Sequence, residues 1–153
     1  MYNRYIETPL GLIRIKASDR GLTEISFRQK NEEEQRFNKH VDVAAKQLME
    51  YFAGLRQEFQ LTYDIIGTDF RMKVWHELQK ISYGSTISYK ELAIRVGNPK
   101  AVRAVGGANH WNPLGIVIPC HRVIGADGSL VGYAEGIDKK KWLLDLENRN
   151  TKQ

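Results

Sequence analysis

The chain has 153 residues, of which 42% are hydrophobic and 27% charged, and a net charge of +5. This balance is typical of a folded protein with one domain or two small ones. No stretch approaches the ~20 apolar residues of a membrane span. Residues 1–7 also lack the apolar core of a signal peptide, so we expect a cytosolic protein that contacts no membrane. A single cysteine excludes an internal disulfide, and four scattered histidines favour neither a metal nor a cofactor.

The positive charge is concentrated in the second half of the chain. Residues 1–66 hold ten basic and ten acidic residues, whereas residues 67–153 hold thirteen basic and eight acidic ones. Within residues 71–122 eight basic residues stand against two acidic ones. Such a field suits a polyanion such as nucleic acid, although charge alone leaves a solvated basic face as an equal alternative.

The first 66 residues have the pattern of a small unit that mixes strands and a helix. Apolar residues alternate with polar ones in some segments, as in strands, and recur at helical spacing in another. The expected elements are strands over 13–17, 23–27 and 58–63, turns at 9–11 and 19–21, a loop over 31–35, and a helix over 41–52 that ends at Gly54.

Residues 65–68 form the expected boundary, after which the pattern becomes mainly helical. Apolar residues predict a helix over 70–81, and Ser88 with Glu91 has the form of a capping box that opens another. Gly97 ends this short helix, and Asn98 is expected to cap the next one with Pro99 at its first position. Two short helices joined by a tight turn predict a helix-turn-helix.

The second of these helices contains many small residues and two basic ones. Adjacent glycines lower helix stability, which is tolerated where something approaches the backbone closely. A tightly packed neighbouring helix and a nucleic-acid groove are both open explanations, and the two cations favour the groove. The small residues are Ala101, Ala104, Gly106, Gly107 and Ala108, and the cations are Lys100 and Arg103.

The lone thiol follows an apolar segment that we expect to be a short buried strand, over 115–118, stopped by Pro119. Cys120 is followed by His121 and Arg122. Nearby cationic or proton-accepting groups favour the thiolate, which is the nucleophilic form. Neighbours in sequence need not touch, however, and a lone cysteine is commonly a small buried hydrophobe.

A longer pattern resembles the O6-alkylguanine-DNA alkyltransferase family, over roughly residues 69 to 147. Its centre is the Pro-Cys-His-Arg-Val-Ile-Gly string that begins at Pro119. The flanking parts follow in the family's order: Tyr89, the segment 97–108, Asn112-Pro113, Gly132-Tyr133-Ala134, Trp142-Leu143-Leu144 and Glu147.

The resemblance implies a catalytic group of five residues. Cys120 corresponds to the alkyl acceptor, and His121 to the base that takes its proton through a bound water. Glu147 corresponds to the acid that orients the histidine, and Asn112 to the hinge that braces the site. Tyr89 corresponds to the tyrosine that helps rotate the nucleotide and donates a hydrogen bond to the base.

The resemblance also implies the DNA-binding and pocket residues. Arg103 corresponds to the finger that fills the space left by the flipped base, and Arg122 is included among the DNA contacts. The other expected DNA contacts are Lys100, Ala101, Ala104 and Gly106, and the expected pocket residues are Val123, Tyr133, Ala134 and Glu135. Glu135 stands where the family commonly has glycine, which predicts poor reaction with bulky adducts.

The implied activity is repair of double-stranded DNA that carries O6-alkylguanine, and also O4-alkylthymine. A modified atom inside the duplex is hidden, so the nucleotide must leave the stack before a thiolate can attack it. The thioether product is stable, so one molecule should repair one lesion. We expect a monomer, with cooperative binding along DNA left open.

Two other classes of protein share parts of this pattern. A lesion sensor or helix-turn-helix regulator binds DNA without chemistry, but sensors of this family lack the acceptor cysteine that is present here. A cysteine hydrolase would need an oxyanion hole and an acyl substrate. Transfer of a methyl group to the protein, absence of transfer, and repeated turnover distinguish the three classes.

The predicted fold is α+β. It combines an N-terminal α/β unit over 1–66, ribonuclease H-like by resemblance, with a C-terminal domain over 67–153. The second domain is expected to be winged-helix-like and to hold the helix-turn-helix and the alkyl acceptor.

Overall fold

A computed structural model of the chain describes residues 1–31 and 33–151. The chain forms two compact units: Met1–Ile66 with Pro113–Gly115, and Gly67–Asn112 with Ile116–Gln153. The loop expected over 31–35 includes Glu32, which lies outside the described residues. Within the described part of the chain, no helix has the length and apolar character to cross a membrane.

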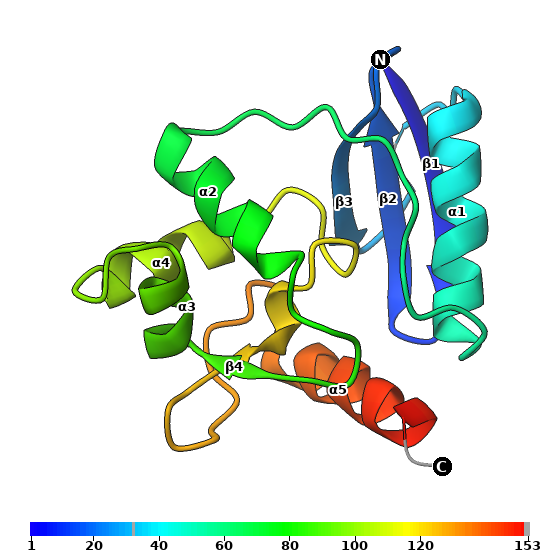
Figure 1. The fold of residues 1–153 in the computed structure, drawn as a ribbon. Coiled ribbons are helices and arrows are strands. Elements are labelled where there is room, and N and C mark those ends of the chain that lie inside the picture. Colours follow the sequence, from blue (N-terminus) through cyan, green and yellow to red (C-terminus); the bar gives the residue numbers. More distant parts are fainter. Residues whose placement is uncertain (32, 152–153) are drawn as a thin grey trace. The chain divides into compact units, whose positions relative to one another are not determined.

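The first unit is a three-stranded antiparallel sheet covered on one face by a helix (Figure 1). Its strands are β1 (Tyr2–Thr8), β2 (Gly11–Ala17) and β3 (Leu22–Arg28), and its helix is α1 (Lys39–Phe52). The apolar residues of the alternating pattern are buried in this core, Ile13, Ile15 and Ala17 completely. The mixed α/β character expected for this unit is confirmed.

The expected strand over 58–63 is wrong. Only Tyr63 pairs with the sheet, through a single parallel bridge to Leu22. The rest of that segment has no strand partner among the described residues and follows the surface as irregular chain. Apolar and polar residues alternate there, but a strand needs a neighbouring ladder as well as a pattern.

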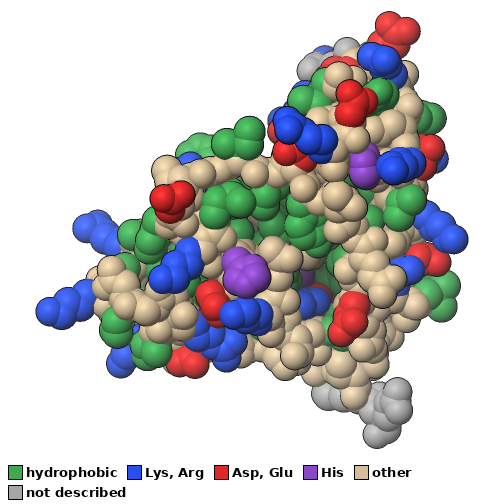
Figure 2. All heavy atoms as spheres, turned by 45° about the horizontal axis from the view of Figure 1, so that its top comes forward, with side chains coloured by type: hydrophobic (Ala, Val, Ile, Leu, Met, Phe, Trp, Pro, Cys, Tyr) green, Lys and Arg blue, Asp and Glu red, His purple; other side chains and the backbone are tan. Residues whose placement is uncertain are grey.

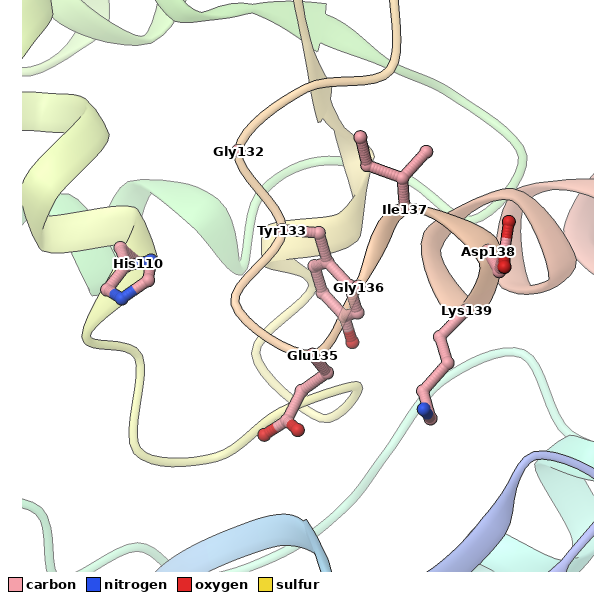
Figure 3. A pocket seen from close by; sticks show the side chains of 8 residues that line it. All are labelled: His110, Gly132, Tyr133, Glu135, Gly136, Ile137, Asp138 and Lys139. Atoms are coloured by element: carbon pink, nitrogen blue, oxygen red, sulfur yellow. The ribbon is translucent and has the colours of Figure 1, made fainter.

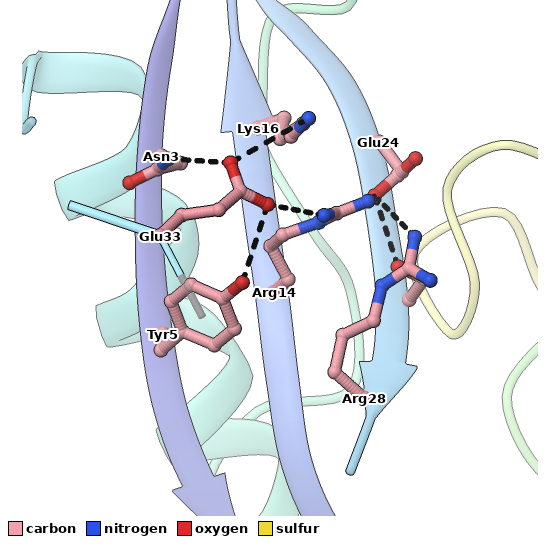
Figure 4. Close-up of polar contacts among 8 residues, drawn as sticks. Asn3, Tyr5, Arg14, Lys16, Glu24, Arg28 and Glu33 are labelled. Carbon is pink, nitrogen blue, oxygen red and sulfur yellow. Dashed lines mark hydrogen bonds and ion pairs between the residues drawn. The ribbon is translucent and has the colours of Figure 1, made fainter. Parts of the chain in front are cut away.

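The open face of the sheet carries an ionic network (Figure 4). Arg14 lies between two carboxylates: its Nη2 is 2.7 Å from Glu24, and its Nη1 contacts Glu33. Glu33 also accepts hydrogen bonds from Asn3 at 3.0 Å and from Tyr5 at 3.3 Å. These bonds fix the segment around Glu33 to the outer face of the sheet.

The second unit is mainly helical. Its α2 packs on α4, and the Trp75 indole donates a 2.8 Å hydrogen bond to the Ala108 carbonyl across that contact. Two short strands, β4 and β5, pair in parallel. The elements in order are α2 (Asp69–Leu78), β4 (Ile87–Ser88), α3 (Tyr89–Arg95), α4 (Val102–His110), the 3-10 turn η1 (Cys120–Arg122), β5 (Val123–Ile124) and α5 (Ile137–Thr151).

The helix-turn-helix consists of α3 and α4. Ser88 caps the start of α3 as expected, since its hydroxyl accepts a 3.0 Å hydrogen bond from the Glu91 amide, while the Glu91 carboxylate contacts Arg95 at 3.3 Å. Gly97, with a φ of 84°, follows the end of α3. Asn98 does not cap α4, which begins only at Val102. The Asn98 carbonyl instead accepts a 3.0 Å hydrogen bond from Ala101, closing a turn that delays the helix.

The expected strand over 115–118 is also wrong. Ile25 exchanges backbone hydrogen bonds with Pro113 and Gly115 within the first unit, and the chain then turns. Ile116 has a φ of 72°, a strained value for a β-branched residue. Ile116 and Ile118 are nevertheless buried. The segment is therefore an apolar turn that leads directly into η1.

Candidate active site

Cys120 opens η1, and only 6% of its surface is exposed. Burial raises the pKa of this thiol to about 11, although a hydrogen bond from Asn112 and the charge of Lys140 act in the opposite direction. At neutral pH the thiol is therefore protonated, and its reaction as a nucleophile needs a base nearby.

His121 and Glu147 form a completely buried pair beside the cysteine. The Nε2 atom of His121 lies 2.7 Å from a carboxylate oxygen of Glu147. Burial lowers the pKa of His121, and the contact with Glu147 opposes this only in part, so the ring is neutral at neutral pH. Because an ionised carboxylate only accepts hydrogen bonds, Nε2 carries the proton and Nδ1 has the free lone pair. Nδ1 has no hydrogen-bond partner among the described residues and is the basic atom.

Arg122 does not lie where a DNA contact would need it. Its side chain is buried and donates two hydrogen bonds to Glu147, at 2.7 and 2.9 Å, and a third to the Ile81 carbonyl at 2.7 Å. Burial acts to raise the pKa of Glu147, but the hydrogen bonds from His121 and Arg122 hold it well below its ordinary value. Arg122 was expected as a DNA contact, but its guanidinium is buried against Glu147, where it helps to keep that carboxylate ionised.

Two asparagines brace the cysteine from the side of α4. Asn112, expected as a hinge, donates a 2.7 Å hydrogen bond to the Ile118 carbonyl and holds the turn before η1. Asn109 was not expected at the site. It is 2% exposed and its amide donates to the Cys120 carbonyl at 3.4 Å. The helical spacing from the buried Val105 could have indicated that Asn109 faces inward.

Lys140 is a second residue that the sequence reasoning missed. It is completely buried on α5, and its ammonium donates to the carbonyls of Val123 and Val131, the latter at 2.7 Å. Burial lowers the pKa of Lys140 to about 8. Its spacing of seven residues from Glu147, two helical turns, was the signal that both lie on one inward face. The Val123 carbonyl, expected to hold the guanine edge, already accepts one hydrogen bond from this lysine.

Tyr89 begins α3 and reaches across to the loop before α5. Its hydroxyl donates a 2.9 Å hydrogen bond to the Val131 carbonyl. Burial, with the nearby Cys120, raises the pKa of this hydroxyl. Gly132 makes the approach possible, because its φ is 75° and an added Cβ would lie 2.5 Å from the Tyr89 oxygen. The structure thus brings Tyr89 close to the cysteine and the loop that contains Tyr133.

A pocket of about 580 Å³ lies over this loop (Figure 3). Tyr133 lines it and is itself buried, and its hydroxyl has no hydrogen-bond partner within residues 1–31 and 33–151. Glu135, Lys139 and His110 also line the pocket, with His110 and Lys139 on opposite sides of Tyr133, and Glu135 and Lys139 are partly exposed. Ala134, also expected at the pocket, is exposed at the surface of the loop.

The outward face of α4 combines small and basic residues. Arg103, Ala104 and Gly107 of α4 are exposed, as is Lys100 in the turn before it, and Figure 2 shows Lys and Arg side chains over the end of this unit that holds α3 and α4. An added Cβ at Gly107 would meet nothing within 4 Å. Close packing of a neighbouring helix therefore does not explain Gly107. Of the two explanations for the small residues of this helix, close approach of a nucleic acid is the one that remains for Gly107.

Two further expected contacts on α4 face differently. An added Cβ at Gly106 would lie 3.9 Å from the ring of Tyr89, so this glycine faces the interior of the unit. Ala101 is the residue before the first turn of α4.

No group of three His, Cys, Asp or Glu side chains with the arrangement of a metal site occurs within the described part of the chain.

Comparison with known proteins covers both units. Residues 1–65 match the family described as "6-O-methylguanine DNA methyltransferase, ribonuclease-like domain", and residues 69–149 match its "DNA binding domain". A methylated-DNA–protein-cysteine methyltransferase from Methanosarcina barkeri is 44% identical, over 98% of this chain and 99% of that protein.

Solved structures agree with these matches. The O6-methylguanine methyltransferase of Mycobacterium tuberculosis is 40% identical, with a TM-score of 0.89 over 99% of this chain and 94% of that one. The structure of the Mycobacterium tuberculosis protein OGT in complex with DNA is 41% identical, with a TM-score of 0.90 over 98% of this chain and 94% of that one. The α+β fold expected from the sequence is confirmed by these neighbours.

Proposed function

This chain belongs to the 6-O-methylguanine DNA methyltransferase family, and on that premise we propose that Cys120 is the residue that accepts the methyl group. The activity of the family is DNA repair by transfer of a methyl group from O6-methylguanine in DNA to a cysteine of the protein. The observation that carries the assignment is that the sequence contains one cysteine and that it adjoins the buried His121–Glu147 pair.

The proposed chemistry is a single displacement at the methyl carbon. His121 Nδ1 removes the proton of the Cys120 thiol, directly or through water, and the thiolate attacks the methyl carbon. The S–C bond forms as the C–O6 bond breaks, and the electron pair of that bond stays on the guanine. The proton taken from sulfur is finally returned to the guanine, so the products are a neutral base and a methyl thioether.

The buried groups around His121 support its role as the base. The resting thiol is protonated, so attack must be coupled to proton removal. When His121 becomes cationic, the ionised Glu147 compensates the new charge within the buried site. Arg122 is then a positioning residue, since it keeps Glu147 ionised and correctly oriented. No side chain of this group is arranged to cleave a thioether, so the product persists and each molecule acts once.

The substrate is double-stranded DNA that carries O6-alkylguanine, and O4-alkylthymine belongs to the same chemical class. The exposed face of α4 enters the DNA groove, where Gly107 and Ala104 allow close approach of the backbone. Arg103 extends from the same face to occupy the space of the flipped nucleotide. We propose that a single protein molecule acts at each lesion and that the protein is cytosolic.

The stoichiometry of repair tests the proposed function. Duplex DNA with one O6-methylguanine is mixed with increasing amounts of protein, and the remaining lesions are counted. Loss of one lesion per molecule of protein, with no further turnover, is the expected result. Continued turnover would indicate a hydrolase, and tight binding without loss of lesions would indicate a sensor.

A further inference from the structure

The pocket next to Tyr133 has charged side chains on its rim, and their arrangement points to selection among adducts. Glu135, Asp138 and Lys139 all line it, so two carboxylates stand against one ammonium. We propose that Glu135 makes the site discriminate between alkyl groups by their charge, and that it disfavours adducts carrying a negative charge. This inference rests on the proposed function and extends it to the class of alkyl group that is accepted.

The position of Glu135 relative to Tyr133 is the geometric basis. In Figure 3 the Tyr133 hydroxyl and the Glu135 carboxylate extend to the same side of the loop, whereas Asp138 turns away from them. Tyr133 and Glu135 are both less exposed than Asp138, which is at the surface. On the proposed function, a substituent longer than methyl on the guanine oxygen extends into this pocket past Tyr133 and meets the Glu135 carboxylate, which lines it.

The charge of Glu135 already acts on the reacting atom. It raises the pKa of Cys120, in addition to the larger effect of burial, and it has the same effect on Tyr133. Lys140 acts on Cys120 with the opposite sign and more strongly, but its ammonium contacts the carbonyls of Val123 and Val131 and is not among the groups that line the pocket. Lys139 on the pocket rim offsets one of the two carboxylates, which leaves one negative charge in excess.

The size of the expected discrimination follows from Coulomb's law. Two like charges about 7 Å apart repel each other at an effective dielectric constant of about 20. Compared with a neutral pair, this repulsion corresponds to a factor of roughly 50 in the rate constant. Glu135 is partly exposed, and solvent and salt reduce this effect. An anionic adduct should therefore react roughly tenfold more slowly than a neutral adduct of the same size.

Two adducts of matched size separate charge from volume. O6-carboxymethylguanine is an anion at neutral pH, and O6-carbamoylmethylguanine is its neutral analogue of nearly equal shape. The second-order rate constant of transfer is measured for each, in the same duplex, with the unmodified protein, Glu135→Gln and Asp138→Asn. Glu135→Gln retains the volume of the side chain, and Asp138→Asn removes a carboxylate from the same pocket rim that points elsewhere.

We expect the ratio of the anionic to the neutral rate constant to rise about tenfold in Glu135→Gln and less than twofold in Asp138→Asn. Raising the salt concentration should increase the same ratio in the unmodified protein and in Asp138→Asn, which both retain the Glu135 carboxylate, but not in Glu135→Gln. An unchanged ratio in Glu135→Gln, or an equal rise in both variants, overturns the inference. Transfer from O6-methylguanine by every variant shows that they are folded, and its absence in the unmodified protein would instead overturn the proposed function.

Discussion

Gly107→Ala is expected to make the protein more stable and yet a weaker DNA binder. Gly107 is an exposed position inside α4, and an added Cβ would meet nothing within 4 Å. Alanine is favoured over glycine in a helix interior by about 0.5–1 kcal/mol, mainly because it restricts the unfolded chain. The free energy of unfolding should therefore rise by about that amount, and the midpoint of thermal unfolding by roughly 2–4 °C.

The same methyl group projects from the face that we propose to enter the DNA groove. Holding the helix backbone away from the duplex by one methyl group should lower affinity about tenfold, which corresponds to roughly 1.4 kcal/mol. Urea denaturation measures the first effect, and fluorescence anisotropy with a labelled duplex at fixed salt measures the second.

Gly106→Ala is the matched control, since it is the adjacent glycine of α4 but faces the ring of Tyr89 at 3.9 Å. It should show a similar gain in stability with a smaller loss of affinity. The reasoning is refuted if Gly107→Ala binds DNA as tightly as the unmodified protein, because the glycine would then serve no close approach. A loss of stability in Gly107→Ala would show that the position is packed after all.

Three further residues are tested by the predictions that follow: Arg103, Arg122 and His121. Arg103→Ala should slow repair in duplex DNA far more than reaction with the free O6-methylguanine base, and equal losses on both substrates would exclude the finger role. Arg122→Met should lower the free energy of unfolding in urea by about 3–5 kcal/mol, because Glu147 keeps its buried charge but loses its main partner. Unchanged stability with weakened DNA binding would restore Arg122 as a DNA contact. Because burial lowers the pKa of His121, the transfer rate should stay level as the pH falls through 6.5, and an inflection there would contradict the buried neutral ring. The free energy of unfolding should fall below pH 6.5, because His121 gains a proton more readily in the unfolded chain.

Local signals in the sequence predicted much of the fold. The N-cap at Ser88 and the glycine after α3 depend on contacts within a few residues, so they can be identified without the rest of the chain. The spacing of apolar residues in α1 similarly predicts which face of this helix is buried. Residues 115–118 show the limit of such signals, because a run of four apolar residues fits a buried turn as well as a strand.

The candidate site likewise contains residues that the sequence predicted and residues that it did not. Cys120, His121 and Glu147 were predictable because the resemblance fixed their order, and the described structure brings the histidine and the acid into contact. Arg122 was listed among the DNA contacts, and its contact with Glu147 could not be foreseen because that partner lies 25 residues away in the chain. Lys140 was missed although its spacing from Glu147 places both on one face of α5, because a lysine is rarely buried and its partners are backbone carbonyls.

The central claim is that Cys120 receives the methyl group, and peptide mapping by mass spectrometry tests it most directly. The protein is incubated with duplex DNA that carries O6-methylguanine, digested, and compared with Cys120→Ser treated in the same way. We predict that the peptide containing Cys120 gains the mass of one methylene group in the unmodified protein, and that Cys120→Ser binds the duplex but leaves the lesion intact. Removal of the lesion while Cys120 stays unmodified would contradict the claim.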